Sequence, residues 1–370
     1  MNLINFNNEQ KLIQGEIRKF ATTELEPIAD EIEKTGVFPN DIIKKLSELG
    51  LLSLIIPEKY DGVDMDTTSL CITVEELSKV CASIGVILVV NNCMVAFPLI
   101  KYGQESQKDY YLKKLSNGEI GAYICDPEID IPGRKIETQA LNKDYLISGN
   151  RDFVLNGEAA NFFLMPISLS EGKSFCLFEK GIAGMNFIKP EILGIRTAGI
   201  VSAEFKETQL KNESFLISDD KGEEIQKEIR DYANICFSAI SLGIAQSALS
   251  ASIKYSKERI QFGRRICEFP MIQEMISEMK IKIEAARFLI YDAAFKCDNG
   301  QDYSLASQIA RLHCGDTAVY SGLQAIQIHG GYGYIKDYPV ERYFRDAKVL
   351  QVLDVTPHIL KSDIAKELLK

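Results

Sequence analysis

The stretch that decides the fold runs from Gln327 to Thr356 and reads QIHGGYGYIKDYPVERYFRDAKVLQVLDVT. Gly330 and Gly331 carry no side chain, so their backbone can approach a ligand closely and offer amide donors to phosphate oxygens. Taken alone, a GGxG segment is more often an ordinary turn. Asp354 stands just before Pro357, a residue favoured in the first turn of a helix, so it could also serve as a helix N-cap. The stretch therefore offers a phosphate-binding turn at one end and a carboxylate at the other.

Helical periodicity surrounds this stretch. Apolar residues recur at helical spacing from Glu223 onward, and the joints between the periodic segments are short. Four long helices with short joints predict an antiparallel four-helix bundle. The predicted helices cover residues 235–258, 270–297, 303–328 and 357–369.

The rest of the chain falls into two further parts. Residues 1–117 have helical periodicity, and Asn8 is a candidate cap for the first helix. From Gly118 the apolar segments become short and are separated by glycines, which predicts strands over residues 154–155, 162–167, 175–178 and 201–205. We therefore predict an N-terminal helical domain over 1–117, a middle β domain over 118–221 and a C-terminal four-helix bundle over 222–370.

Composition excludes several classes of protein. The chain has 370 residues, a net charge of −10 and a pI of about 5.1, which argues against a nucleic-acid binder. The nine cysteines show no metal-ligand spacing, so we expect no metal site and a reducing compartment, the cytoplasm. No apolar run approaches the length needed to cross a membrane, and no basic patch with an apolar core indicates a signal peptide.

Three segments of the C-terminal part carry a resemblance to a known family. They are GIAQSAL at 243–249 with YSKERIQFG at 255–263, QIHGGYGY at 327–334, and DYPVER at 337–342 with RDAK at 345–348. Together they resemble the acyl-CoA dehydrogenase family, and weaker matches at 50–62 and 193–196 extend the likeness over nearly the whole chain. The resemblance implies a helical domain, a β-barrel-like middle domain and a four-helix bundle. It also implies bound FAD, an acyl thioester substrate, an electron-transfer flavoprotein or equivalent acceptor, and a homodimer or homotetramer.

The resemblance also assigns residues to the cofactor. Arg259 matches the arginine that reaches the FAD pyrophosphate across a subunit interface, although a surface salt bridge would be its ordinary use. Gln327 matches a residue near the adenosine. The cofactor-binding residues implied are Arg259, Phe262, Gln327, Gly330, Gly331 and Thr356 in the bundle, and Cys125, Phe153 and Leu155 in the β domain.

The β domain departs from the family pattern beside the flavin. Leu155 replaces a threonine whose hydroxyl would face the ring near N5, which removes a hydrogen bond worth about 1 kcal/mol. The chain contains no Trp, so Phe153 takes the place of the ring-side tryptophan. Cys125 begins a stretch in which Pro127 alone is retained unchanged, and Ile131 replaces a serine that would touch substrate or cofactor.

The substrate side departs as well. Asp231 matches a substrate-side acid and Tyr334 closes the glycine segment, but Asn234 stands where an arginine is usual. Loss of this cation predicts weaker binding of CoA. It would suit a thioester on an acyl carrier protein, because the pantetheine arm of such a protein lacks the adenine nucleotide. His358 replaces a glutamine that would contact FAD; an ordinary first-turn helix residue is the other interpretation.

The resemblance gives the catalytic base as Asp354. The family reaction needs a base for the α-proton of the thioester, while the flavin takes a hydride from the β-carbon. Most members place a glutamate where this chain has Asp354, and members that place it elsewhere would have it at Ala233. Aspartate keeps the carboxylate on an arm shorter by one methylene, and reacting atoms must approach within roughly 3–3.5 Å.

The leading hypothesis is therefore an FAD-dependent dehydrogenase that oxidises an acyl thioester on CoA or a carrier protein. The altered β-domain residues leave two alternatives open. One is a non-catalytic or half-site subunit of a heteromeric complex. The other is a flavin oxidase or monooxygenase that uses oxygen.

Overall fold

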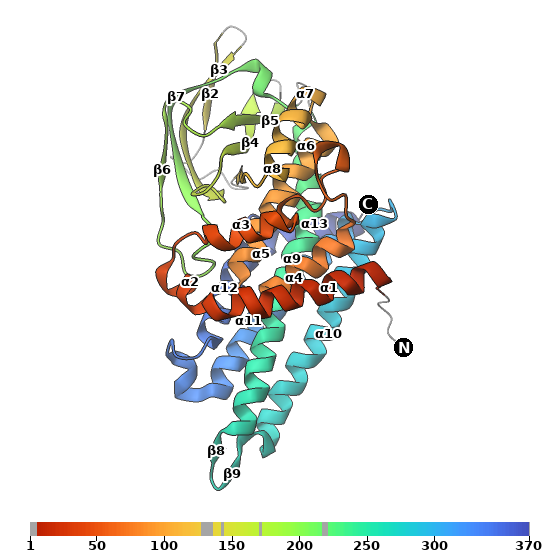
Figure 1. The fold of residues 1–370 in the computed structure, drawn as a ribbon, viewed down its shortest axis with the longest axis vertical. Helices are drawn as coiled ribbons and strands as arrows, with labels where there is room; N and C mark the ends of the chain where they lie inside the picture. The colour runs from red at the N-terminus through yellow and green to blue at the C-terminus, as the bar shows by residue number, and fades with distance from the viewer. Residues whose placement is uncertain (1–5, 127–135, 142–143, 170–171, 217–220, 370) are drawn as a thin grey trace.

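The computed structural model describes residues 6–126, 136–141, 144–169, 172–216 and 221–369. Helices come first along the chain, strands follow, and helices return, as the periodicity predicts. In Figure 1 the sheet lies at one end of the molecule, and the C-terminal helices run from beside it to the opposite end. We keep the domain limits 1–117, 118–221 and 222–370 as a proposal.

The N-terminal part is a group of short helices, and every residue from Ala82 to Ala96 within it is buried. The first helix is capped by Asn7 rather than Asn8, because Asn7 and Gln10 exchange the hydrogen bonds of a capping box. The π-helical stretch η5 (Val90–Ala96) joins α5 to α6. The helices are α1 (Asn8–Phe20), α2 (Ala29–Thr35), α3 (Asn40–Glu48), α4 (Thr67–Ser78), α5 (Ala82–Val89), α6 (Phe97–Tyr102), α7 (Glu105–Gln107) and α8 (Lys113–Ser116).

Two buried carboxylates on α4 tie this part to its neighbours. The side chains of Glu75 and Glu76 are each 1% exposed, and buried charges must be paired to be tolerated. Glu76 pairs with Arg18 of α1 at 2.9 Å. Glu75 accepts hydrogen bonds from Arg287 Nη1 at 2.9 Å, Tyr291 OH at 2.7 Å and Gln246 Nε2 at 2.8 Å. Because these partners lie on α9 and α10, the two acids fix α4 against α1 and the bundle.

The middle part is a seven-stranded sheet in the order β5-β4-β1-β3-β7-β6, with β2 paired to β3. All named pairs are antiparallel except β1 with β4. No pairing joins β5 to β6 among the described residues, but Phe163 of β4 stacks on Phe187 of β6 with 5.2 Å between ring centres, so the sheet curls around its own core as the barrel-like prediction implies. The strands are β1 (Gly121–Ile124), β2 (Glu137–Leu141), β3 (Asp144–Leu155), β4 (Phe162–Leu169), β5 (Gly172–Glu179), β6 (Met185–Ile188) and β7 (Val201–Leu210).

The sheet sends alternate residues to two different cores. Tyr123, Cys125 and Leu155 belong to the large apolar core shared with the helices. Their neighbours Ile124 and Val154 belong to a second core on the opposite face of the sheet. This alternation follows from the two-residue period of a strand. It places Cys125 and Leu155 on the face that meets the bundle.

The C-terminal bundle contains one helix more than predicted, because α12 forms within residues 327–356. By length and composition α9 and the segment Ala82–Tyr102 could cross a membrane, contrary to our expectation. However, 78% and 89% of their most apolar windows are buried within the fold, so they are core helices. The elements are α9 (Gly222–Glu258), β8 (Ile260–Gln261), β9 (Arg264–Arg265), η8 (Ile266–Glu268), α10 (Pro270–Asp298), α11 (Ser304–His329), η9 (Gly330–Tyr334), α12 (Val340–Val352) and α13 (Pro357–Leu368).

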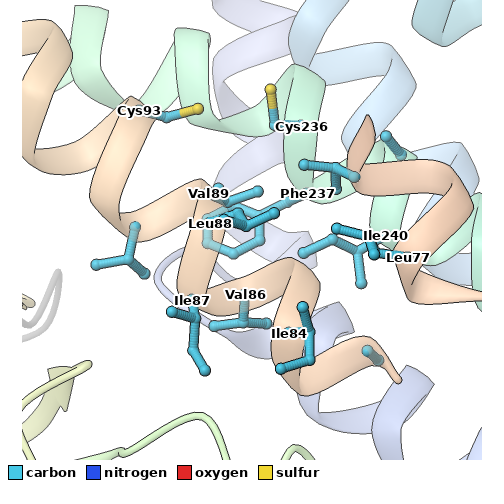
Figure 2. Close-up of a cluster of buried hydrophobic side chains, with 14 of the residues drawn as sticks. Leu77, Ile84, Val86, Ile87, Leu88, Val89, Cys93, Cys236, Phe237 and Ile240 are labelled. Carbon is cyan, nitrogen blue, oxygen red and sulfur yellow. The ribbon is translucent and has the colours of Figure 1, made fainter. Parts of the chain in front are cut away.

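The contact between α5 and α9 forms the centre of the large core. Figure 2 shows Phe237 of α9 lying against Leu88 and Val89 of α5. All three side chains are at most 1% exposed. Close packing fixes the rotamer of each of these side chains. The ring of Phe237 is therefore a rigid surface for a group that packs on its other face.

Candidate active site

Asp354 lies in the short turn between α12 and α13. The flanking side chains of Leu353 and Val355 are 4% and 1% exposed, whereas Asp354 is only half-buried. The N–H of Val355 donates to the carbonyl of Leu353 at 2.9 Å, and Asp354 has φ +66°. A three-residue turn with positive φ at its centre is a rare and strained form. Two buried neighbours therefore anchor a strained turn that presents the carboxylate.

Asp354 is not the cap of the helix that follows. The N-cap of α13 is Thr356, with extended backbone and no capping hydrogen bond from its side chain. The carbonyl of Thr356 accepts the first hydrogen bonds of the helix, from Ile359 and Leu360. The capping interpretation of Asp354 is therefore wrong, and its carboxylate is available for other work.

The end of β1 meets Asp354 from the sheet. The thiol of Cys125 lies within hydrogen-bonding reach of the Asp354 carboxylate. Burial, together with the charge of Asp354 and this hydrogen bond, holds the pKa of Cys125 well above its usual value. The thiol is therefore protonated at neutral pH and acts as the donor. Tyr123 is buried beside this pair, and burial and then the charge of Asp354 raise its pKa well above the usual value.

Arg311 of α11 approaches the same turn from the bundle. Its side chain is 3% exposed, and Nη2 donates to the carbonyls of Leu350 at 2.6 Å and Leu353 at 3.0 Å. The guanidinium carbon lies 4.7 Å from the centre of the Phe237 ring. Sequence reasoning missed this residue. The available signal was that Arg311 is the one lysine or arginine in α11, a helix otherwise rich in small and apolar residues.

The predicted flavin-side residues of β3 differ in exposure. Leu155 is fully buried and pairs with Tyr123 in the ladder between β1 and β3. Phe153 is 49% exposed, and its carbonyl accepts from the N–H of Cys125 at 2.9 Å. Cys125, Phe153 and Leu155 therefore lie together at the end of β1, and Cys125 contacts Asp354. Ile131 and Pro127 lie outside the described residues.

A second group of predicted residues forms a pocket of about 410 Å³ in the bundle. Arg259, Gly330 and Gly331 line it, together with aromatic side chains. The Arg259 guanidinium carbon lies 5.6 Å from the centre of the Tyr332 ring, and Arg259 forms no ion pair with any residue that the structure describes. The salt-bridge alternative is therefore not supported. The lining residues are Tyr255, Arg259, Gln261, Ile266, Ile328, His329, Gly330, Gly331, Tyr332 and Ile335.

His329 shapes the inner wall of this pocket. Its ring stacks on Tyr255 with 4.2 Å between ring centres, and Nδ1 donates to the carbonyl of Ala325 at 2.8 Å. Burial lowers the pKa of His329, so the ring is neutral at neutral pH and Nε2 is an acceptor. The wall therefore combines flat aromatic rings with the cation of Arg259.

Three predicted residues lie near this pocket without lining it. Gln327 is exposed on α11, and its carbonyl accepts from the N–H of Gly330. Phe262 is 93% exposed at the tip of the β8–β9 hairpin, and Tyr334 is 88% exposed at the end of η9. Aromatic side chains exposed to this extent are typical of surfaces that a partner covers. Their binding roles stay predictions.

Asp231 is satisfied within the bundle. It is 3% exposed and accepts hydrogen bonds from Lys227 at 2.6 Å, Ser304 at 2.7 Å and Gln308 at 3.1 Å. These contacts give it a structural role between α9 and α11, and its predicted contact with substrate stays a prediction. One turn further along α9, the side-chain nitrogen of Asn234 is buried and has no hydrogen-bond partner among the described residues.

The two groups of predicted residues do not share a pocket within one chain. No residue of the β domain, and none from the α12–α13 turn, lines the Arg259 pocket. Figure 1 shows the β8–β9 hairpin at the end of the bundle farthest from the sheet. The Arg259 pocket and the Asp354 turn are therefore separate features of the chain.

Comparison with known proteins agrees with this architecture. Residues 7–119 match the model of the acyl-CoA dehydrogenase N-terminal domain, and residues 220–369 match that of the C-terminal domain. The short-chain specific acyl-CoA dehydrogenase of Clostridium acetobutylicum is 35% identical over 99% of both chains. Butyryl-CoA dehydrogenase from Megasphaera elsdenii superposes with a TM-score of 0.93 at 30% identity, over 99% of this chain and 100% of that one.

A third similar chain comes from a structure named for an electron carrier. A chain in the structure described as the electron transferring flavoprotein of Acidaminococcus fermentans superposes with a TM-score of 0.94 at 33% identity, over 100% of both chains. Fold and comparisons together define a flavin-dependent oxidoreductase of acyl thioesters. The chain belongs to the acyl-CoA dehydrogenase family.

The cofactor of this family is FAD, and the residues present fit its nucleotide end. Gly330 has φ +60°, and a Cβ atom at Gly330 or Gly331 would meet nothing within 4 Å, so the backbone there lies open to a ligand. Arg259 supplies the cation that a pyrophosphate requires, in a planar form that binds two oxygens at once. Tyr255 and His329 supply flat surfaces for the rest of the nucleotide.

Proposed function

We propose that this chain oxidises a short acyl thioester, with the Asp354 carboxylate removing the α-proton. The observation that carries the proposal is the α12–α13 turn, which fixes a carboxylate with no ion pair at the junction of bundle and sheet among the described residues. When bound, FAD supplies the acceptor for the hydride from the β-carbon. The names of the relatives support a short-chain acyl-CoA as substrate.

The surrounding residues prepare Asp354 for this role. The Cys125 thiol donates to one carboxylate oxygen and so limits the rotation of the side chain. Leu155 and the buried residues beside it exclude water from that side, which strengthens electrostatic interactions at the carboxylate. The free oxygen of the carboxylate receives the proton. A shorter base can work here because the strained turn and the thiol fix its position.

The test is the visible spectrum of the purified protein. We expect a yellow protein whose flavin absorbance bleaches when butyryl-CoA is added without oxygen. A colourless protein that FAD does not reconstitute would overturn the proposal and favour the non-catalytic subunit. Consumption of oxygen in step with substrate loss would favour the oxidase. The same assay with a butyryl group on a carrier protein tests whether Asn234, in place of an arginine, signals a carrier-bound substrate.

We propose further that the chain forms homodimers or homotetramers in the cytoplasm and passes electrons to an electron-transfer flavoprotein. The exposed Phe262 and Tyr334 near the Arg259 pocket support assembly through this end of the bundle. The likeness to a chain solved in an electron transferring flavoprotein structure supports the partner.

An apolar groove on the N-terminal helices is the docking site we propose for that flavoprotein. It has a volume of about 430 Å³ and lies between α1 and the segment 49–65. Leu12 and Leu49 are 66% and 53% exposed at its edge, and Glu16, Lys19 and Glu24 add charges to the lining. An exposed apolar groove with charged side chains around it is typical of a protein-binding site.

Replacing Leu12 with arginine should separate electron transfer from chemistry. We expect Leu12→Arg to lower the rate of flavoprotein reduction by about tenfold or more, because a charge in the apolar groove costs binding energy. Turnover with an artificial dye should be unchanged. The matched control is Leu141→Arg, an exposed leucine of β2, which should leave both rates unchanged. Equal loss in both assays, or loss in neither, would rule out the groove as the docking site.

A further inference from the structure

Arg311 is buried in the bundle without the partner that a buried arginine usually has. Its side chain is 3% exposed, and no carboxylate lies within salt-bridge distance of it among the residues described. Nη1 has no hydrogen-bond partner there. Desolvation of a guanidinium costs several kcal/mol. Burial of this guanidinium without an ion pair therefore indicates a specific role.

Both hydrogen bonds that Arg311 makes go to the end of α12 and the residue after it. The last carbonyls of a helix have no partner within the helix and carry partial negative charge. Nη2 donates to the carbonyl of Leu350 at 2.6 Å and to that of Leu353 at 3.0 Å. Arg311 therefore closes the C-terminal end of α12 from a neighbouring helix.

The carbonyl of Leu353 is also part of the strained turn at Asp354. It accepts from Arg311 and, at 2.9 Å, from the N–H of Val355, the bond that closes the turn. The guanidinium itself rests on the ring of Phe237, which Figure 2 shows packed against Leu88 and Val89 of the apolar core. A rigid chain of contacts thus runs from the core through Phe237 and Arg311 to the turn.

The charge of Arg311 also acts on Asp354. Burial lowers the pKa of Arg311 to about 10, and the negative charge of Asp354 opposes this fall, so the guanidinium stays cationic at neutral pH. The other titratable groups around Asp354 are Tyr123 and Cys125 on β1 and, next to these two, Arg230 on α9; Cys314 adjoins Arg311 on α11. Tyr123 and Cys125 have raised pKa values and are neutral, so the cations on the bundle side are Arg311 and Arg230, of which Arg311 also holds the turn.

We propose that Arg311 is a positioning residue for the base: it holds the strained turn that carries Asp354 and supplies a compensating positive charge beside the carboxylate. This inference rests on the proposed function for the catalytic part, because it assumes that Asp354 is the base. The mechanical part stands on the geometry alone. Arg311 touches neither substrate nor flavin in this account.

The test compares Arg311→Met, which removes the charge and both hydrogen bonds, with Arg311→Lys, which keeps the charge. The matched control is Arg287→Met, which removes an arginine of α10 that pairs with Glu75 and does not touch the turn. Three quantities are measured on FAD-loaded protein: amide hydrogen exchange over residues 350–356, the rate of anaerobic flavin bleaching by butyryl-CoA, and the melting temperature.

For Arg311→Met we expect faster exchange over residues 350–356 and a rate about 100-fold lower, because a base displaced by roughly 1 Å loses about that factor. Arg311→Lys should share the faster exchange but lose less of the rate, because it keeps the positive charge beside the carboxylate. Arg287→Met should lower the melting temperature and change neither the exchange over 350–356 nor the rate of bleaching.

Two outcomes would overturn the proposal. Unchanged exchange over 350–356 in Arg311→Met would show that the turn does not depend on Arg311. An equal loss of rate in Arg311→Met and Arg311→Lys would show that the charge does not act on the base. Failure of the proposed function has a different signature, because a wild-type protein without bleaching leaves the exchange readout intact.

Discussion

Replacing Asp354 with asparagine should lower the rate of flavin bleaching by acyl thioester about 1,000-fold, which is within the range that general base catalysis contributes. The amide has the shape of the carboxylate, and its oxygen still accepts from the Cys125 thiol, but it cannot take up a proton. FAD content and melting temperature should match those of the wild type. The measurement is a single turnover with butyryl-CoA in the absence of oxygen.

Asp354→Glu is the informative companion to this variant. It restores the arm length found in most of the family and keeps the charge, so we expect measurable activity. If Asp354→Asn keeps more than a tenth of the wild-type rate, another group removes the proton and the assignment of the base is wrong. A variant that is inactive because it has lost FAD would not count, which is why flavin content is measured on the same sample.

The helical parts were predictable from sequence because apolar residues recur there at helical spacing over long stretches. The strands β1 and β2 were harder to predict from sequence. Each residue of β1 is buried, so the strand shows no alternation of apolar and polar side chains, and β2 is largely exposed and polar. The helix α12 is not among the predicted elements, because its amphipathic stretch is short and lies between Pro339 and a strained turn.

Some active-site residues can be proposed from local sequence, and others cannot. Asp354 and Arg259 stand in local motifs, so a short stretch of sequence suffices to propose them. The meeting of Cys125 with Asp354 depends on how β1 packs against the α12–α13 turn, and no local pattern encodes that. Arg311 acts on a turn to which it is linked only by the packing of α11 against α12. Residues that work by positioning others are hidden from sequence reasoning because their partners are set by tertiary structure.

The separation of the Arg259 pocket from Asp354 has a consequence for assembly that subunit mixing can test. In a twofold dimer each chain gives the same surface to its partner, so one FAD site can combine Asp354 of one chain with Arg259 of the other. Arg259→Met should weaken FAD binding about tenfold to hundredfold, because a charge-assisted bidentate contact is worth about 1.5–3 kcal/mol. At limiting FAD this variant should be inactive, as should Asp354→Asn.

Heterodimers of the two inactive variants should then regain activity. One of their sites carries both changes and the other carries neither, so a purified heterodimer should show about half of the wild-type rate at limiting FAD. If both residues served the same site from one chain, every site would carry one defect and nothing would be regained. The matched control is Arg264→Met on the same hairpin, which does not line the pocket and should retain FAD on its own. Recovery in the mixed dimer would place the flavin between two chains and exclude a half-site subunit that needs a different relative.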